Sequence, residues 1–94
     1  MYRQSAFKKY NSIKKKLPLP LRNQINPIED EIALNPYSGE KKGDLKDVFV
    51  MRFILLGEEY LLACKIDERE REVIFLAIGG HENFYRDLKR YLKS

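Results

Sequence analysis

Apolar positions along the chain follow two periods, and the period changes near residue 47. Ahead of that point, apolar residues recur three or four positions apart, as they do on one face of a helix. Residues 5–17 therefore predict a helix, whose inward face carries Ala6, Tyr10, Ile13 and Leu17. The lysines of this stretch fall on its other face, so the predicted helix is amphipathic.

A second helix is predicted over residues 21–34, after two prolines end the first. Its inward positions are Leu21, Ile25, Ile28 and Ile32, with Leu34 closing the series. Pro27 lies inside this stretch, and a proline in a helix interior removes a hydrogen bond and kinks or splits the helix. Because Asn26, Pro27 and Glu29 match the residues that begin a helix, we expect a break at Asn26 and a new helical start.

Beyond residue 47 the apolar residues alternate at every second position, which is typical of β-strands. Residues 47–56 predict a strand with one face made by Phe49, Met51, Phe53 and Leu55, and the other by Val48, Val50, Arg52 and Ile54. Residues 59–66 and 72–79 predict two more strands, with the first turn at residues 57–58. Such short connections make neighbouring strands antiparallel. The tail over residues 81–92 predicts a final helix.

Helices come first, strands next and one short helix last, which indicates an α+β fold. We expect an N-terminal helical hairpin packed on a small twisted antiparallel sheet, in a single domain over residues 1–94. The one cysteine, Cys64, alternates with apolar neighbours and is predicted to be buried rather than reactive. One histidine and scattered acids make no ligand set, so neither a metal nor another cofactor is expected.

The sequence contains no segment that predicts export or membrane insertion. No apolar run approaches the roughly 20 residues that a membrane-spanning helix needs. The N-terminus lacks the apolar core of a signal peptide. We therefore expect a cytoplasmic protein that makes no membrane contact.

Positive charge is concentrated at the N-terminus of a chain whose net charge is +4. Residues 1–22 contain no acid, and their cations are Arg3, Lys8, Lys9, Lys14, Lys15, Lys16 and Arg22. A segment whose charged residues are all positive attracts polyanions, which favours nucleic acid or another acidic partner. Lys8, Lys9 and Lys15 are accordingly candidates for RNA contact. The alternative is a solvated helix face that serves only solubility.

Arg52 is the only charged residue among residues 48–56. An arginine is costly to bury, so the strand face that carries it is predicted to be open or to line a groove. A planar guanidinium in a groove suits a phosphate group. The alternative is a solvated strand face, with the arginine stem lying along the sheet.

His81 and Tyr85 are the candidates for proton transfer. His81 is the only histidine and follows two glycines at the end of the last predicted strand, and an imidazole can move a proton near neutral pH. Tyr85 lies four residues later, on the same side of a helical turn, where it could stack on a base or carry a proton. The structural alternatives are a helix-start hydrogen bond for His81 and packing beside Phe84 for Tyr85.

Three lysines lie just ahead of the first long strand, at Lys41, Lys42 and Lys46. Three cations within six residues can contact the phosphates of a nucleic-acid backbone. An ordinary exposed loop explains them equally well.

In order and spacing, the chain resembles the RelE/ParE superfamily of bacterial toxins from type II toxin–antitoxin systems. The resemblance is carried by SAFKK at 5–9, KLP at 16–18, IALNPYSG at 32–39, KGDL at 42–45 and IGGHENFY at 78–85. It implies a helical hairpin on a twisted sheet and a cognate antitoxin that binds the toxin as a hetero-oligomer. The RelE-like branch cuts messenger RNA on the ribosome, whereas the ParE-like branch inhibits DNA gyrase.

The RelE-like branch is favoured, because His81, Tyr85 and Arg52 fall where that branch places its site residues. The resemblance then implies a metal-independent endoribonuclease, in which a ribose 2′-hydroxyl attacks the adjacent phosphate. Lys42 and Lys46 would lie near the basic approach to this site.

The chain departs from the RelE-like pattern at two places. The arginine that often follows Gly-x-Tyr in the second long strand is absent from residues 57–61. Residues 2–4 can form only a stub of the strand that usually opens the fold. Two alternatives therefore stay open: a ParE-like toxin without nuclease activity, and an antitoxin-binding module whose chemistry has decayed.

Overall fold

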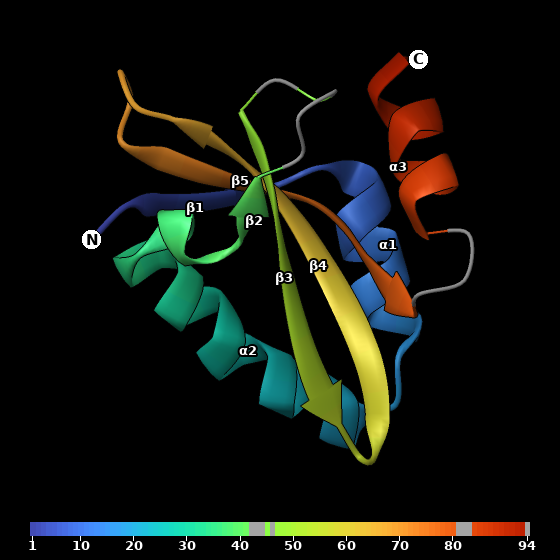
Figure 1. The fold of residues 1–94 in the computed structure, drawn as a ribbon. Coiled ribbons are helices and arrows are strands. Elements are labelled where there is room, and N and C mark those ends of the chain that lie inside the picture. The colour runs from blue at the N-terminus through green and yellow to red at the C-terminus, as the bar shows by residue number, and fades with distance from the viewer. Residues whose placement is uncertain (42–44, 46, 81–83, 94) are drawn as a thin grey trace.

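The computed structural model describes residues 1–41, 45, 47–80 and 84–93. The chain order is β1 (Arg3–Ala6), α1 (Lys8–Lys16), α2 (Leu19–Leu34), the 3-10 turn η1 (Pro36–Ser38), β2 (Glu40–Lys41), β3 (Val48–Leu55), β4 (Glu58–Asp67), β5 (Glu72–Gly80) and α3 (Phe84–Lys93). The strands form one sheet, with α1 and α2 packed on one face and α3 on the other (Figure 1). The expected α+β architecture is confirmed.

The sheet has the strand order β1-β5-β4-β3-β2. Strands β3 to β5 pair antiparallel, as expected. The short antiparallel strand β2 was not predicted, and β1 adds a parallel edge beside β5, so the sheet is mixed and not wholly antiparallel. The first predicted helix is therefore wrong at its start, because Ser5 and Ala6 belong to β1 and the helix begins at Lys8. Backbone bonds from Arg3 N to Arg71 O (2.8 Å) and from Phe7 N to Phe75 O (2.9 Å) flank this pairing.

Helix α2 runs unbroken through Pro27, so the predicted break at Asn26 is wrong. Pro27 can donate no hydrogen bond to the carbonyl of Asn23. Both residues are solvent-exposed, so water can satisfy that carbonyl. The buried residues Ile25 and Ile32, on either side of the proline, hold the helix against the sheet. The prediction that Leu34 faces inward is also wrong, because this side chain is exposed.

The larger core lies between the sheet and the helices α1 and α2. The predicted alternation in β3 is confirmed: Phe49, Met51, Phe53 and Leu55 join this core, while Val48 and Val50 join the cluster on the opposite face. Cys64 is fully buried in the larger core, also as predicted, and burial raises the pKa of its thiol to about 12. The thiol is therefore neutral and inert in the folded protein.

The smaller core lies between the sheet and α3. A β-bulge in β5 leaves Leu76 unpaired between the pairs Ala63–Ala77 and Cys64–Phe75, and it interrupts the alternation of β5. Leu76 and Ala77 consequently both join this second cluster, where they pack with Phe84 and Leu88 of α3. The bulge thus gives α3 a wider apolar surface to pack against than a regular strand would.

The turn between β3 and β4 fixes how these two strands are aligned. Leu56 and Gly57 form it with positive φ angles of 51° and 81°, as in a two-residue type I′ hairpin. The turn therefore lies one residue earlier than predicted, and Leu55 faces Glu58 across the hairpin. This alignment decides which residue of β4 lies beside Arg52.

Candidate functional site

Arg52 lies on the strand face that α1 and α2 do not cover. It faces Leu61 of β4 across the pair, and it follows Val50 by two residues on the same strand. Both neighbours belong to the cluster under α3, so Arg52 shares their face of the sheet. Its side chain is 47% exposed, which agrees with the prediction that an open face carries this arginine.

Glu59 is the counter-charge of Arg52. Its carboxylate Oε1 lies 3.6 Å from Nη1 of the guanidinium, and the Glu59 side chain is 40% exposed. At that distance and exposure, an ion pair contributes little to stability. The guanidinium therefore remains accessible to a stronger anion such as a phosphate diester. The sequence did not single out Glu59, although the alignment set by the hairpin turn places it diagonally across from Arg52.

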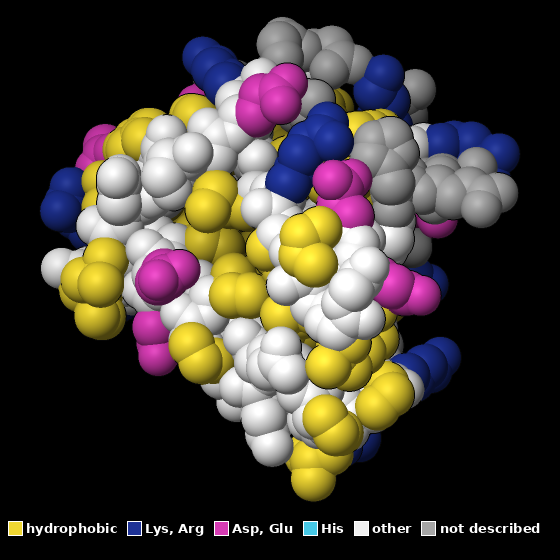
Figure 2. All heavy atoms as spheres, turned by 60° about the horizontal axis from the view of Figure 1, so that its bottom comes forward, with side chains coloured by type: hydrophobic (Ala, Val, Ile, Leu, Met, Phe, Trp, Pro, Cys, Tyr) yellow, Lys and Arg dark blue, Asp and Glu magenta, His cyan; other side chains and the backbone are white. Residues whose placement is uncertain are grey.

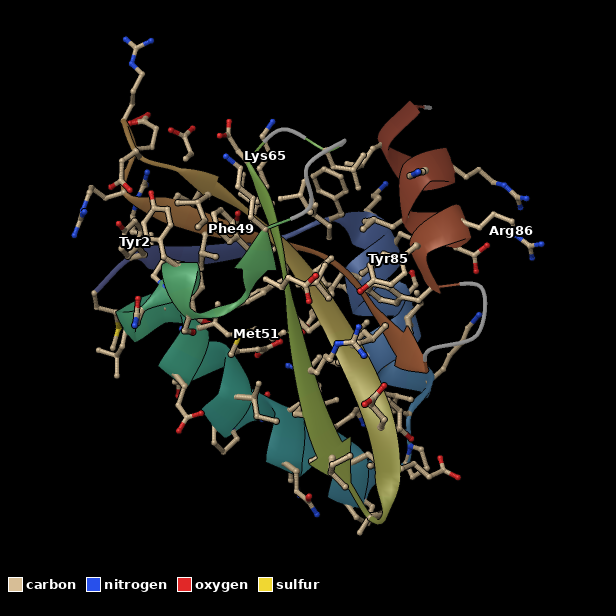
Figure 3. The ribbon with its side chains drawn as sticks, in the orientation of Figure 1. Tyr2, Phe49, Met51, Lys65, Tyr85 and Arg86 are labelled. Atoms are coloured by element: carbon tan, nitrogen blue, oxygen red, sulfur yellow. The ribbon has the colours of Figure 1, made fainter. Side chains whose placement is uncertain are left out.

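Tyr85 reaches the same face of the sheet from α3. It packs against the cluster under α3, and its ring meets that of Phe84 edge-to-face at 5.4 Å. Figure 3 shows Tyr85 directed from α3 towards the strands, whereas Arg86 points away from the sheet. The structural alternative for Tyr85, packing beside Phe84, is thus observed, and Tyr85 also lies on the face that carries Arg52.

Three of the predicted site residues lie outside the described part of the chain: His81, Lys42 and Lys46. The end of β5 at Gly80 immediately precedes His81 in the chain, and α3 begins at Phe84. His81 therefore follows, by chain connectivity, the strand that ends beneath α3. Its role stays a prediction.

The remaining lysines do not gather around Arg52. Lys8, Lys9 and Lys15 lie exposed on α1, which packs on the opposite face of the sheet. Lys41 lies on β2, the edge strand, where it faces Phe49. These cations can contribute to a general positive field, but the described part of the chain does not bring them into contact with Arg52 or Tyr85.

A second group of polar residues, missed by the sequence analysis, ties the N-terminus to the β4–β5 turn. The Glu68 carboxylate accepts hydrogen bonds from the hydroxyls of Tyr2 (2.9 Å) and Tyr37, and from Arg71 (2.9 Å). The bond from Tyr37, followed by the bond from Tyr2, lowers the pKa of Glu68. In the reverse direction, the bond to Glu68, followed by desolvation, raises the pKa of Tyr37 to about 12. The two tyrosines are far from Glu68 in sequence, so no local pattern signals their bonds to it, whereas Arg71 is only three residues away.

None of the helices in the described part of the chain is long and apolar enough to cross a membrane. Among the same residues, no three His, Cys, Asp or Glu side chains gather in a way that could hold a metal ion. The described open face thus carries an accessible guanidinium and carboxylate, while the hydroxyl of Tyr85 on the same face is buried.

Residues 1–89 match the family model of ParE-like toxins of type II bacterial toxin–antitoxin systems. The chain therefore belongs to this family, and it is a toxin of the RelE/ParE superfamily. No curated protein matches the chain.

Solved structures of toxins share the fold at low sequence identity. An Escherichia coli RelE mutant in the free state matches with a TM-score of 0.77 and 17% identity, over 95% of each chain. A chain of the intact E. coli RelBE toxin–antitoxin complex matches with 0.73 and 18%, over 87% of this chain and 99% of that one. The Mycobacterium tuberculosis RelBE2 complex gives 0.72 and 18%, over 85% and 98%. At these identities the likeness establishes the fold alone.

Proposed function

We propose that this toxin inhibits translation by cutting messenger RNA on the ribosome, as a metal-independent endoribonuclease. The observation that supports this proposal is the position of Arg52 on the open face of the sheet, with Tyr85 packed on the same face and its hydroxyl buried. A half-exposed guanidinium whose ion pair with Glu59 is weak can bind a phosphate. The Tyr85 hydroxyl, buried on the same face, would have to become exposed before it could transfer a proton to or from the RNA.

In the proposed reaction, a ribose 2′-hydroxyl loses its proton and its oxygen attacks the adjacent phosphorus. The bond from phosphorus to the 5′ oxygen breaks, and that oxygen gains a proton. The products are a 2′,3′-cyclic phosphate and a 5′-hydroxyl. We assign the two proton transfers to His81 and Tyr85, and stabilisation of the phosphate charge to Arg52.

The proposed regulator is a cognate antitoxin that binds as a hetero-oligomer. Strand β2 pairs only with Phe49 and Val50, so no other described strand covers the outer edge of β3 beyond them. Ile54 and Leu56 are exposed beside this edge, and Leu19 and Leu34 are exposed on α2. Figure 2 shows hydrophobic side chains spread over this end of the molecule, with most Lys and Arg near the rim of the view. An extended or helical antitoxin segment would cover such a surface.

The test is a translating extract in which message ends are mapped by primer extension. We expect the wild-type protein to cut messages only when ribosomes are present. Arg52→Ala should lower the cleavage rate about 100-fold, because one charge-stabilising donor is lost. Arg90→Ala, which removes an exposed cation from α3, is the matched control and should cut normally. Intact messages in the presence of ribosomes and folded wild-type protein would reject the proposal.

A second candidate function is inhibition of DNA gyrase. It is favoured by the match to the ParE-like family model and by Glu59, which places an anion beside Arg52 in a strand that lacks the expected arginine. A supercoiling assay distinguishes the two, because a gyrase inhibitor blocks supercoiling and leaves messages intact. If the chemistry has decayed, expression without antitoxin should cause neither message cleavage nor growth arrest.

A further inference from the structure

A cleft of about 500 Å³ lies at the end of the sheet away from the β3–β4 turn. Its walls come from β2, β3, β4, β5, η1 and the β4–β5 turn, and the side chains that matter are Lys41, Lys65, Arg69, Tyr37 and Phe49. Figure 3 shows Lys65 and Phe49 towards this end of the sheet, away from Tyr85. The cleft is thus separate from the Arg52 site.

The cations of the cleft are available to a ligand, while two of its three acids are engaged. Lys41, Lys65 and Arg69 have no hydrogen bond or ion pair to another described residue. Asp47, Asp67 and Glu68 also line the cleft. The Glu68 carboxylate already accepts three donors, and Asp67 accepts the backbone N–H of Glu70 at 3.2 Å. An incoming phosphate would therefore meet three cations that have no partner among the described residues, with Asp47 as the one cleft carboxylate not already bonded there.

An aromatic platform lies beside these cations. Tyr37 is 50% exposed, and its ring packs edge-to-face with Phe49 at a centroid distance of 5.3 Å. The hydrogen bond from Tyr37 to Glu68 fixes the orientation of the ring. An exposed, immobilised ring beside lysine and arginine is the combination that stacks an unpaired base and holds its phosphate.

We propose that this cleft binds a nucleotide of single-stranded RNA, with Lys41, Lys65 and Arg69 on its phosphates and Tyr37 on its base. Lys65 faces Val48 in the sheet, and Val48 lies four residues before Arg52 on the same strand. That separation corresponds to about 13 Å along the strand. One RNA strand could therefore contact both places. The inference rests on RNA being the target, as in the proposed function, but it does not require cleavage.

The test measures binding of a fluorescent single-stranded RNA decamer whose 2′ positions carry methyl groups, so that it cannot be cut. Lys65→Ala/Arg69→Ala should weaken binding at least tenfold and reduce the slope of log K against log salt by about 1.4, because two phosphate contacts are lost. Tyr37→Leu should weaken binding about fivefold or more, and Tyr37→Phe much less, since the ring is retained. The control is Arg86→Ala/Arg90→Ala, which removes the same charge from exposed positions of α3.

The inference is overturned if the Lys65/Arg69 variant binds like the wild-type protein, or if the α3 control loses as much affinity. It is also overturned if the wild-type protein does not bind the decamer. Message cleavage in the translating extract separates this inference from the proposed function. If the wild-type protein cuts messages but the cleft variant binds RNA normally, only the proposed RNA-binding role of the cleft is rejected. If RNA binding depends on the cleft but no message is cut, only the proposed nuclease activity is rejected.

Discussion

Arg52 meets a carboxylate where the proposed reaction needs a phosphate. Glu59 lies 3.6 Å from the guanidinium, and both side chains are about half exposed. Exposed pairs of this kind contribute about 0.2–1 kcal/mol. A phosphate that binds Arg52 must displace Glu59 or share the guanidinium with it, and in either case it approaches a negative charge. Glu59 should therefore weaken RNA binding without taking part in the chemistry.

We expect Glu59→Gln to lower the KM for an RNA substrate about two- to fivefold, the factor that corresponds to a lost surface ion pair, and to leave kcat unchanged. The matched control is Glu58→Gln, which makes the same charge change on the opposite face, where Glu58 faces Leu55. Equal effects of the two variants would mean that net charge, and not the pair with Arg52, is responsible.

Sequence patterns predicted part of this site. Arg52 stood out because it interrupts an apolar strand, and the predicted alternation placed it on the correct face. Glu59 could have been found from the same strands, since a two-residue turn at residues 56–57 sets the pairing. Glu68 and its tyrosine partners could not, because their contacts depend on how β1 and η1 pack against the β4–β5 turn.

Helix α2 keeps a proline in its interior because the packing of its apolar side chains outweighs the local sequence preference for a helix start at Pro27. The residues around Pro27 resemble a helix start, yet the buried Ile25 and Ile32 need one continuous helix to reach the sheet. The cost is one backbone hydrogen bond and the strain of the ring, about 3 kcal/mol relative to alanine in a helix interior.

Replacing Pro27 should therefore stabilise the fold. We expect Pro27→Ala to raise the free energy of unfolding by about 1–3 kcal/mol, as measured by urea denaturation. Pro20→Ala is the control, since a proline in the first turn of a helix removes no internal hydrogen bond and its replacement should change little. Unchanged or lower stability of Pro27→Ala would show that the proline fits α2 without strain.

The hydrogen-bonded group around Glu68 joins three elements that are distant in the chain. It links the N-terminal end of β1, through Tyr2, and η1, through Tyr37, to the β4–β5 turn. The pKa of Glu68 is lowered by these bonds. The folded protein thus binds this proton more weakly than the unfolded chain does, so the stabilisation is present above the ordinary glutamate pKa and is lost as pH falls through the lowered value.

We expect Glu68→Gln to lower Tm at pH 6, and we expect the difference from wild type to shrink as the pH is lowered to 3. Other carboxylates also titrate in this range, so the comparison is made against Glu70→Gln, a neighbour in the same turn whose backbone carbonyl, and no side-chain oxygen, accepts a hydrogen bond from another described residue. A Tm difference that does not depend on pH would contradict the assignment to the Glu68 carboxylate.

Among the elements, those with a clear apolar period were predicted from that period, whereas β1 was expected only from the family resemblance, as a stub over residues 2–4. Strand β1 reads Arg-Gln-Ser-Ala and has no apolar alternation, so it forms because the edge of β5 offers hydrogen bonds. No local sequence pattern indicates the bulge at Leu76 either, since residues 75–78 are all buried. Tertiary contacts decide both features.

At the scale of the whole molecule, the two faces of the sheet are used unequally. One face is covered by α1 and α2 and holds the larger core. The other is covered by α3 only near β5, which leaves Arg52, Glu59 and Ile54 exposed beside it. The proposed functional surface is thus the part of the sheet that the helices leave uncovered, and the larger core packs against its other face.

That open face is the basis of the nuclease proposal, and the ends of the cut message test it most directly. Purified ribosomes carrying a defined message are mixed with the toxin, and the fragments are analysed by mass spectrometry. We expect a 2′,3′-cyclic phosphate and a 5′-hydroxyl at a single cut on the ribosome, with little product from Arg52→Ala or Tyr85→Phe. An uncut message, or fragments that end in a 3′-hydroxyl and a 5′-phosphate, would contradict the account.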